Sequence, residues 1–336
     1  MESLLYFLLV VFVVGAVAAL LFFTTRNSLS RETDAAADYA AGLNYLVSGD
    51  SALALDKLKD AVRKDTENLD AYIKIGDILR ESGQVDQAIK VHRDLTARTS
   101  LGLAQQLLIL RSLEADFEVK EAYDSALKVI EKIYELKKDD LWAREKELQI
   151  HESKKDWEKA EAVYRKLAKQ KNKSDDAKVA SYRVEVGRQC MKMQKAKEAR
   201  EAFRQAIKID ESYFPAYSEL SENYLQENRP DDAVDVLKKF VQANPDDAAK
   251  AFARIRELLF TIGEFGEIEN VYNQVISNSP ENWNAYIALA DIKEKKGETE
   301  KAIELCQQIL QKNPDFTRAR EYLVRYYHRQ GNDGLA

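Results

Sequence analysis

The sequence predicts an all-α, right-handed solenoid of about eight helical hairpins, with a capping helix after it and one transmembrane helix before it. Three observations support this fold class. Only 12 glycines and 5 prolines occur among 336 residues, less than half of the roughly 12% of ordinary usage, which favours long helices joined by short connections. A pattern of two helices recurs about every 34 residues, and the chain begins with a long uncharged apolar run.

The composition excludes several classes of protein. Charged residues make up 32% of the chain and hydrophobic residues 45%, so the chain can bury a core and is no disordered polyelectrolyte. The net charge of −6 provides no basic surface for nucleic acid. Cys190 and Cys306 stand alone, which excludes a disulfide framework and a four-thiolate zinc site. We therefore expect no metal, no cofactor and no nucleic-acid partner.

The N-terminal run from Leu4 to Phe23 has no charge and no strongly polar side chain. Twenty helical residues span the hydrocarbon core of a bilayer, about 30 Å. A cleaved signal peptide is the alternative, but it needs a basic residue ahead of a shorter apolar core and a small-residue site at its end. Here Glu2 is the only charged residue ahead of the run, and the small-x-small triplet 16–18 lies inside it. We therefore assign residues 1–30 to an uncleaved anchor.

The flanking charges predict the orientation of this anchor. Arg26 and Arg31 follow the run and no basic residue precedes it, which places the C-terminal side in the cytoplasm. Two unpaired cysteines agree with a reducing compartment. We expect a single-pass membrane protein whose repeats face the cytoplasm.

The rest of the chain is self-similar. A small residue begins the second helix of each hairpin at intervals of 34 to 39 residues: Ala54, Ala88, Ala126, Ala160, Ala199, Ala233, Ile268 and Ala302. Glycine stands twelve residues before it in three hairpins and proline twelve residues after it in three others: Gly42, Gly76, Gly187, and Pro245, Pro280, Pro314. This period, filled with two helical patterns, is the signature of the tetratricopeptide repeat.

Each position in the repeat has a mechanical role. The glycine and the small residue lie where the two helices cross, and the proline ends the second helix. The predicted repeats are residues 35–68, 69–102, 107–140, 141–174, 180–213, 214–247, 249–282 and 283–316. We predict that residues 317–336 form a capping helix and tail that cover the last repeat. Extra residues fall around 103–106 and around 175–179, and we expect the second group to lengthen a loop within one continuous solenoid.

No residues of the chain suggest catalysis. His92, His151, Cys190 and Cys306 stand at core positions of the repeat, where packing is the simplest interpretation. No nucleophile is paired with a base, and no glycine-rich loop could hold a phosphate. We therefore predict that the protein is not an enzyme and has no catalytic residues.

The remaining candidates lie on the surface. In this repeat class, positions 2, 5, 9 and 12 of the first helix point into a groove that suits an extended peptide or a partner helix. In repeats 2 and 8 these positions hold the partner-binding candidates Asp70, Ile73, Asp77, Arg80, Asn284, Ile287, Asp291 and Glu294. Plain solvated surface is the alternative for each. Since a guanidinium suits a partner's carboxylate, we expect Arg80→Ala to weaken binding roughly thirtyfold and to change stability by about 0.5 kcal/mol or less.

One stretch resembles a known family. The first repeat contains YAAGLNYL at 39–46 and ends in Asp65-Thr66, and the second contains GDILRESGQVDQAIKVHRDL at 76–95. With the N-terminal anchor, this pattern resembles the lipopolysaccharide assembly protein B family of bacterial inner-membrane proteins. The segment LEADFEVKEAYDSA in repeat 3 resembles the family more loosely, and beyond about residue 170 only general repeat features match.

The resemblance implies a non-enzymatic adaptor in the bacterial inner membrane. Members of this family couple the level of a lipid A biosynthesis enzyme, the deacetylase, to a membrane-bound AAA+ protease, and they contact lipopolysaccharide assembly components. They end in a rubredoxin-like metal-binding domain with two CxxC pairs, which this sequence lacks, so the metal-linked part of the function is not carried over. A structural or assembly subunit of a larger membrane complex is the alternative function.

Overall fold

The computed structural model describes residues 33–329 and 331, and every regular element in them is an α-helix. The all-helical expectation is therefore confirmed for this part of the chain. The predicted anchor, residues 1–30, lies outside the described residues. None of the described helices is both long and apolar enough to cross a membrane.

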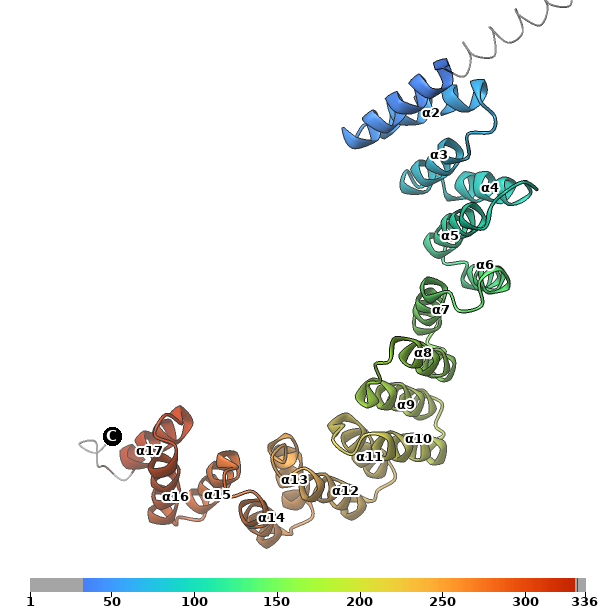
Figure 1. The fold of residues 1–336 in the computed structure, drawn as a ribbon. Helices are drawn as coiled ribbons and strands as arrows, with labels where there is room; N and C mark the ends of the chain where they lie inside the picture. The colour runs from blue at the N-terminus through green and yellow to red at the C-terminus, as the bar shows by residue number, and fades with distance from the viewer. Residues whose placement is uncertain (1–32, 330, 332–336) are drawn as a thin grey trace, which may run out of the picture. The chain divides into compact units, whose positions relative to one another are not determined.

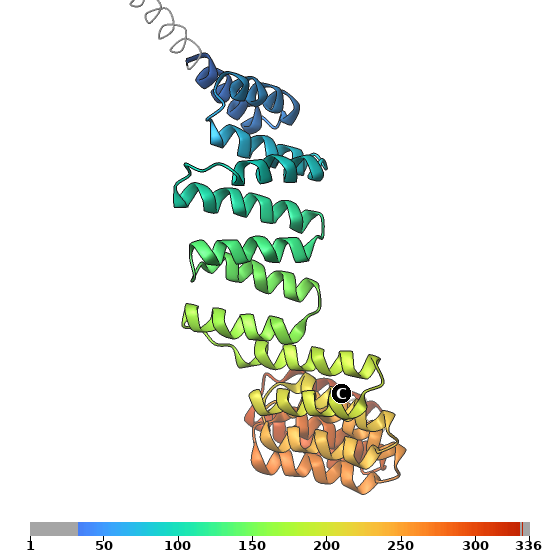
Figure 2. The ribbon, with the colours of Figure 1, turned by 90° about the vertical axis from the view of Figure 1, so that its right-hand side faces the viewer.

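The described residues divide into two compact units between Lys154 and Lys155. The first unit contains a helix over 33–47 and then α2 (Ser51–Lys64), α3 (Leu69–Glu81), α4 (Val85–Thr96), α5 (Leu103–Val119), α6 (Tyr123–Leu136) and α7 (Leu141–Ser153). The second contains α8 (Trp157–Lys171), α9 (Asp176–Lys192), α10 (Ala196–Ile209), α11 (Phe214–Gln226), α12 (Pro230–Ala243), α13 (Ala249–Thr261), α14 (Phe265–Asn278), α15 (Trp283–Lys295), α16 (Thr299–Lys312) and α17 (Thr317–Arg329). Within each unit, successive helices lie side by side in chain order (Figures 1 and 2). The division falls inside the predicted fourth repeat.

The turns between paired helices keep one register. Each has a residue with positive φ, five residues before the small residue that begins the second helix: Gly49, Gly83, Glu121, Lys155, Gln194, Asn228, Gly263 and Gly297. A positive φ reverses the chain within a few residues, and glycine adopts it at the lowest cost. Four of the first helices, α3, α7, α9 and α15, then begin at a capping side chain. In α3 the side-chain oxygen Oδ1 of Asn68 accepts from the Ala71 N–H at 3.0 Å.

The helices of two pairs within the units, α3 with α4 and α9 with α10, cross closely at the predicted positions. All eight small residues are buried, seven of them completely. A Cβ atom added to Gly76 would lie 2.3 Å from His92 Nε2, and one added to Gly187 would lie 2.3 Å from the Phe203 ring. The expectation that glycine permits a close crossing is therefore confirmed.

The last helix covers the final pair. Ala319 and Tyr326 of α17 are fully buried in one apolar cluster with Ala302 and Cys306 of α16. Burial raises the pKa of the Cys306 thiol to about 12, so this cysteine packs as a neutral apolar group. Its predicted core position is confirmed.

The extra residues in the sequence lengthen helices. Both α5 and α9 have 17 residues, whereas α3, α7, α11, α13 and α15 have 13. Four additional residues make about one turn, which preserves the face that the helix presents. The insertion around 175–179 is therefore helical from Asp176 onward, and the expectation of a lengthened loop there is wrong.

Candidate docking surfaces

A buried ionic network joins α3, α4 and α5 in the first unit. Arg80 Nη1 donates to Asp116 Oδ1 at 3.0 Å and Nη2 donates to Asp77 Oδ1 at 2.8 Å. His92 Nδ1 lies 2.6 Å from Asp116 Oδ2 and donates to it, because a carboxylate shared with a guanidinium only accepts. The His92 and Asp116 side chains have no exposed surface. The network thus connects three consecutive helices through one buried carboxylate.

This geometry explains why the sequence motif contains both Arg80 and His92. The two side chains come from different helices of repeat 2 and meet at Asp116 in the LEADF segment of repeat 3. His92 has the predicted buried position, and its second nitrogen lies 3.2 Å from the Ile73 carbonyl oxygen. Its role is therefore both packing and hydrogen bonding across repeats.

The network changes the expectation for Arg80. The side chain is only 17% exposed. Burial by itself would lower the pKa of Arg80, but the hydrogen bonds with Asp116 and Asp77 outweigh burial, so the pKa lies above its ordinary value. A guanidinium with two carboxylate partners inside the chain has few donors left for another protein. Arg80 therefore holds repeats together, and the expected stability change of about 0.5 kcal/mol or less is too small.

The other groove candidates differ in accessibility. Ile73 and Ile287 are only 3% and 2% exposed, because the following helices cover them, so neither presents a surface to a partner. Asn284, Asp291 and Glu294 accept hydrogen bonds from three arginines of α17: Arg318, Arg325 and Arg329. Asp70 is exposed on α3. Partner binding by the polar candidates remains a prediction.

A second buried carboxyl group lies near this network. Glu114 on α5 is fully buried, and neither of its carboxyl oxygens has a hydrogen-bond partner. Burial raises the pKa of Glu114 to about 7; Lys146 of α7 opposes this shift and the Glu118 carboxylate adds to it. The sequence gives no sign of this, because the same residue type on a helix is usually solvated.

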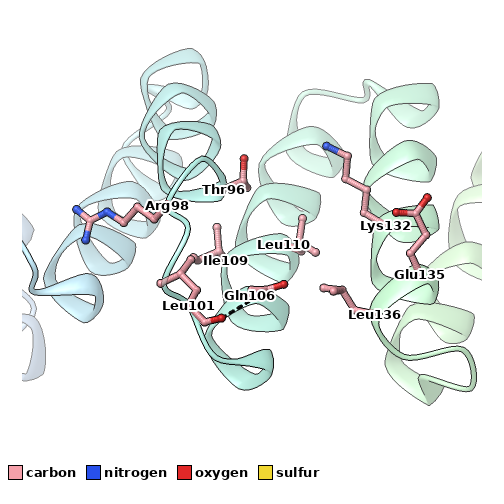
Figure 3. Close-up of a pocket in the computed structure, with 9 residues that line it drawn as sticks. All are labelled: Thr96, Arg98, Leu101, Gln106, Ile109, Leu110, Lys132, Glu135 and Leu136. Atoms are coloured by element: carbon pink, nitrogen blue, oxygen red, sulfur yellow. Dashed lines mark hydrogen bonds between the residues drawn. The ribbon is translucent and has the colours of Figure 1, made fainter.

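A cavity of about 310 Å³ lies where α4, α5 and α6 meet. Figure 3 shows that Arg98 points away from Lys132 and Glu135 on the opposite wall. Arg98 donates to the Thr66 carbonyl at 2.9 Å, and Gln106 donates to the Leu101 carbonyl at 2.8 Å. Both donors are thus bonded to backbone carbonyls and hold the connection between α4 and α5 in place. The polar groups of this cavity therefore do not converge on a common point inside it.

A larger cavity, of about 710 Å³, lies between α13, α14 and α15 in the second unit. We call it the α13–α15 cavity. Its apolar wall consists of Phe260, Phe265, Ile268 and Ile292. Its charged wall consists of Arg256, Lys295, Lys296 and Glu257.

Two aromatic side chains of this cavity face solvent. Phe260 is 65% exposed and Phe265 is 48% exposed, and their ring centroids lie 5.0 Å apart in an edge-to-face arrangement. Among the described residues no other aromatic side chain is exposed to this degree. Neither residue is among the binding candidates predicted from the sequence. Applying the groove positions of repeats 2 and 8 to repeat 7 would have identified Phe260 at position 12.

The comparisons with known proteins find the same kind of repeat in both units. Two family models described as tetratricopeptide repeat match residues 39–102 and residues 191–255 and 263–325, together more than half of the chain. The chain belongs to the tetratricopeptide repeat family. Within the described part, this repeat protein has no cluster of three or more His, Cys, Asp or Glu side chains that could hold a metal ion.

The predicted family resemblance is confirmed by curated relatives. Lipopolysaccharide assembly protein B of Escherichia coli (strain K12) is 24% identical over 310 residues, which covers 92% of this chain and 78% of that protein. The protein of the same name from Haemophilus influenzae is 27% identical over 302 residues, with 85% and 72% covered. A solved structure of MamA is 24% identical, covering 45% of this chain and 87% of that chain, with a TM-score of 0.31.

Proposed function

We propose that this protein is a non-enzymatic scaffold of the bacterial inner membrane, which docks protein partners in lipopolysaccharide assembly. The observation that carries the proposal is similarity to lipopolysaccharide assembly protein B over 92% of this chain. The exposed apolar wall of the α13–α15 cavity supports a role in binding, since monomeric proteins keep large apolar patches for interaction sites.

In this proposal residues 1–30 anchor the chain and the repeats lie in the cytoplasm. The partners would be a membrane-bound AAA+ protease and a lipid A biosynthesis enzyme, and the scaffold would bring the enzyme to the protease for turnover. Tetratricopeptide repeats suit this role because stacked helices present an extended surface without a reaction centre of their own.

Affinity capture from detergent-solubilised membranes tests the proposal. Recovery of a protease together with a lipid A enzyme is the expected result. Stoichiometric recovery of one large complex, without those enzymes, would instead favour a structural or assembly subunit. A variant without residues 1–30 is the control for the anchor, and it should move from the membrane fraction to the supernatant.

A further inference from the structure

The α13–α15 cavity combines two features that are unusual together. Its apolar wall includes the exposed pair Phe260 and Phe265, and burying an exposed ring of this size against a partner is favourable. Its volume of about 710 Å³ lies within the range of about 300–1,000 Å³ that is typical of ligand pockets. The cavity can therefore receive a large apolar side chain.

The charged wall of the cavity has more cations than carboxylates. Three cations line it, and its one carboxylate, Glu257, is 64% exposed and is bound by Arg254 at 2.8 Å. Lys295 binds Asp291 at 2.9 Å and Lys296 binds Glu269 at 2.6 Å, but in each pair the lysine is the exposed member, with 57% and 42% exposure against 16% and 15%. Each ammonium has three donors, so the lysines retain donors for an acidic group outside the chain.

We propose that the α13–α15 cavity docks a peptide segment of a protein partner, with one large apolar side chain flanked by acidic residues. The apolar side chain packs on Phe260 and Phe265, and the acidic residues face Lys295 and Lys296. Aromatic side chains of this kind are typical anchors of binding energy. The inference rests on the proposed scaffold function and specifies its docking surface.

The same charges disfavour a second copy of this chain as the occupant. In a two-fold dimer the patch would face itself, which would bring Lys295, Lys296 and Arg256 against the same cations. Like charges across an interface are costly. A cavity also fits a protruding side chain better than the surface of a bilayer.

Selection from a random dodecapeptide library displayed on phage tests the proposal, with the detergent-solubilised full chain as the immobilised target. The expected consensus has an aromatic or large aliphatic residue next to Asp or Glu. Phe260→Ala should weaken binding of the selected peptide about thirtyfold with an unchanged melting temperature, because surface substitutions seldom alter stability. Met193→Ala is the matched control, since Met193 is also 65% exposed but lies outside the cavity.

Charge reversal provides a readout that a purely structural role would not change. The double variant Lys295→Glu with Lys296→Glu should select basic residues where the wild type selects acidic ones. Both facing carboxylates keep another partner in this variant, because Arg256 binds Asp291 and Lys293 binds Glu269. A wild-type consensus without acidic residues would overturn the proposal, as would a selected peptide that binds Phe260→Ala as strongly as the wild type. So would sedimentation of a wild-type dimer that Phe260→Ala converts to monomer.

The two proposals can fail separately. If capture recovers the lipid A enzyme and the protease with Phe260→Ala as strongly as with the wild type, the docking surface lies elsewhere and the scaffold function stands. If the peptide selection succeeds but capture recovers neither enzyme, the cavity is a docking site and the proposed function is wrong.

Discussion

Arg80 and Phe260 occupy the same place in two repeats, eight residues before the small residue that begins the second helix. Their surroundings differ. Arg80 ends on the buried carboxylate of Asp116, whereas Phe260 faces solvent beside an open cavity. This difference in exposure comes from the hairpin that follows each residue. The next first helix after Arg80, α5, contributes the carboxylate of Asp116, whereas α15 contributes the apolar side chain of Ile292 to the wall of the cavity beside Phe260.

This comparison shows when a groove position is a candidate for docking. A side chain that the next hairpin binds, as α5 binds Arg80, contributes to the stacking of repeats. A side chain that the next hairpin leaves exposed, as in repeat 7, keeps its surface for a partner. Position in the repeat is therefore insufficient, and the partner atoms across the repeat boundary decide the role.

The largest expected effect comes from breaking the ionic network of Arg80, His92 and Asp116 in the first unit. Asp116→Ala should lower the free energy of unfolding of the first unit by about 3 kcal/mol, because it leaves the Arg80 and His92 side chains without their shared carboxylate. Urea denaturation measures the change, and hydrogen exchange should show the loss of protection in α3, α4 and α5. Asp70→Ala, at an exposed position of α3, is the control and should remain near the wild type.

A pH titration tests the buried carboxyl group of the same region. The pKa of Glu114 is about 7 in the folded protein, above its ordinary value of 4.5, so the folded state binds more protons between these values. Stability should therefore fall as pH rises from about 4.5 through 7, by on the order of 2 kcal/mol.

Glu114→Gln should flatten that dependence, as followed by the melting temperature between pH 4.5 and 8. Glu135→Gln, at an exposed position of α6, is the matched control and should retain the wild-type slope. An equally steep slope in Glu114→Gln would show that another group is responsible.

The smallest expected effect concerns the turns of the two regions. Gly263 and Glu121 stand at equivalent positions, five residues before Ile268 and Ala126, and both have positive φ. Because this backbone conformation costs a non-glycine residue about 1 kcal/mol, Glu121→Gly should stabilise the first unit by up to about that amount. Gly263→Ala should act in the opposite direction in the second unit. Urea denaturation measures the free energy of unfolding of both variants, which should rise for Glu121→Gly and fall for Gly263→Ala.

Much of the fold could be predicted because its determinants are local. The recurring small residues mark the helix crossings, and Gly76 lies against His92 as its place in the repeat indicates. The insertion around 175–179 could be located, but its assignment to a loop was wrong, because the polar residues Asp175, Asp176 and Lys178 suit the start of a helix as well as a loop. The anchor in residues 1–30 stays a prediction.

The candidate site was less predictable because its determinants lie between repeats. Arg80 and Asp116 are 36 residues apart, and nothing in either segment alone indicates that they meet. Ile73 is buried because Leu95 and Ile109 pack around it, a contact that the groove position does not reveal. Phe260 could have been found by applying that position to every repeat.

The most direct test of the account compares Arg80→Ala with Phe260→Ala in two measurements, the free energy of unfolding and the affinity for the selected peptide. We expect Arg80→Ala to lower the free energy of unfolding by about 2 kcal/mol, through its lost charged hydrogen bonds, and to leave the affinity of the folded protein unchanged. Phe260→Ala should leave stability unchanged and weaken binding about thirtyfold. The opposite assignment, with Arg80→Ala stable but deficient in binding and Phe260→Ala binding normally, would contradict the account.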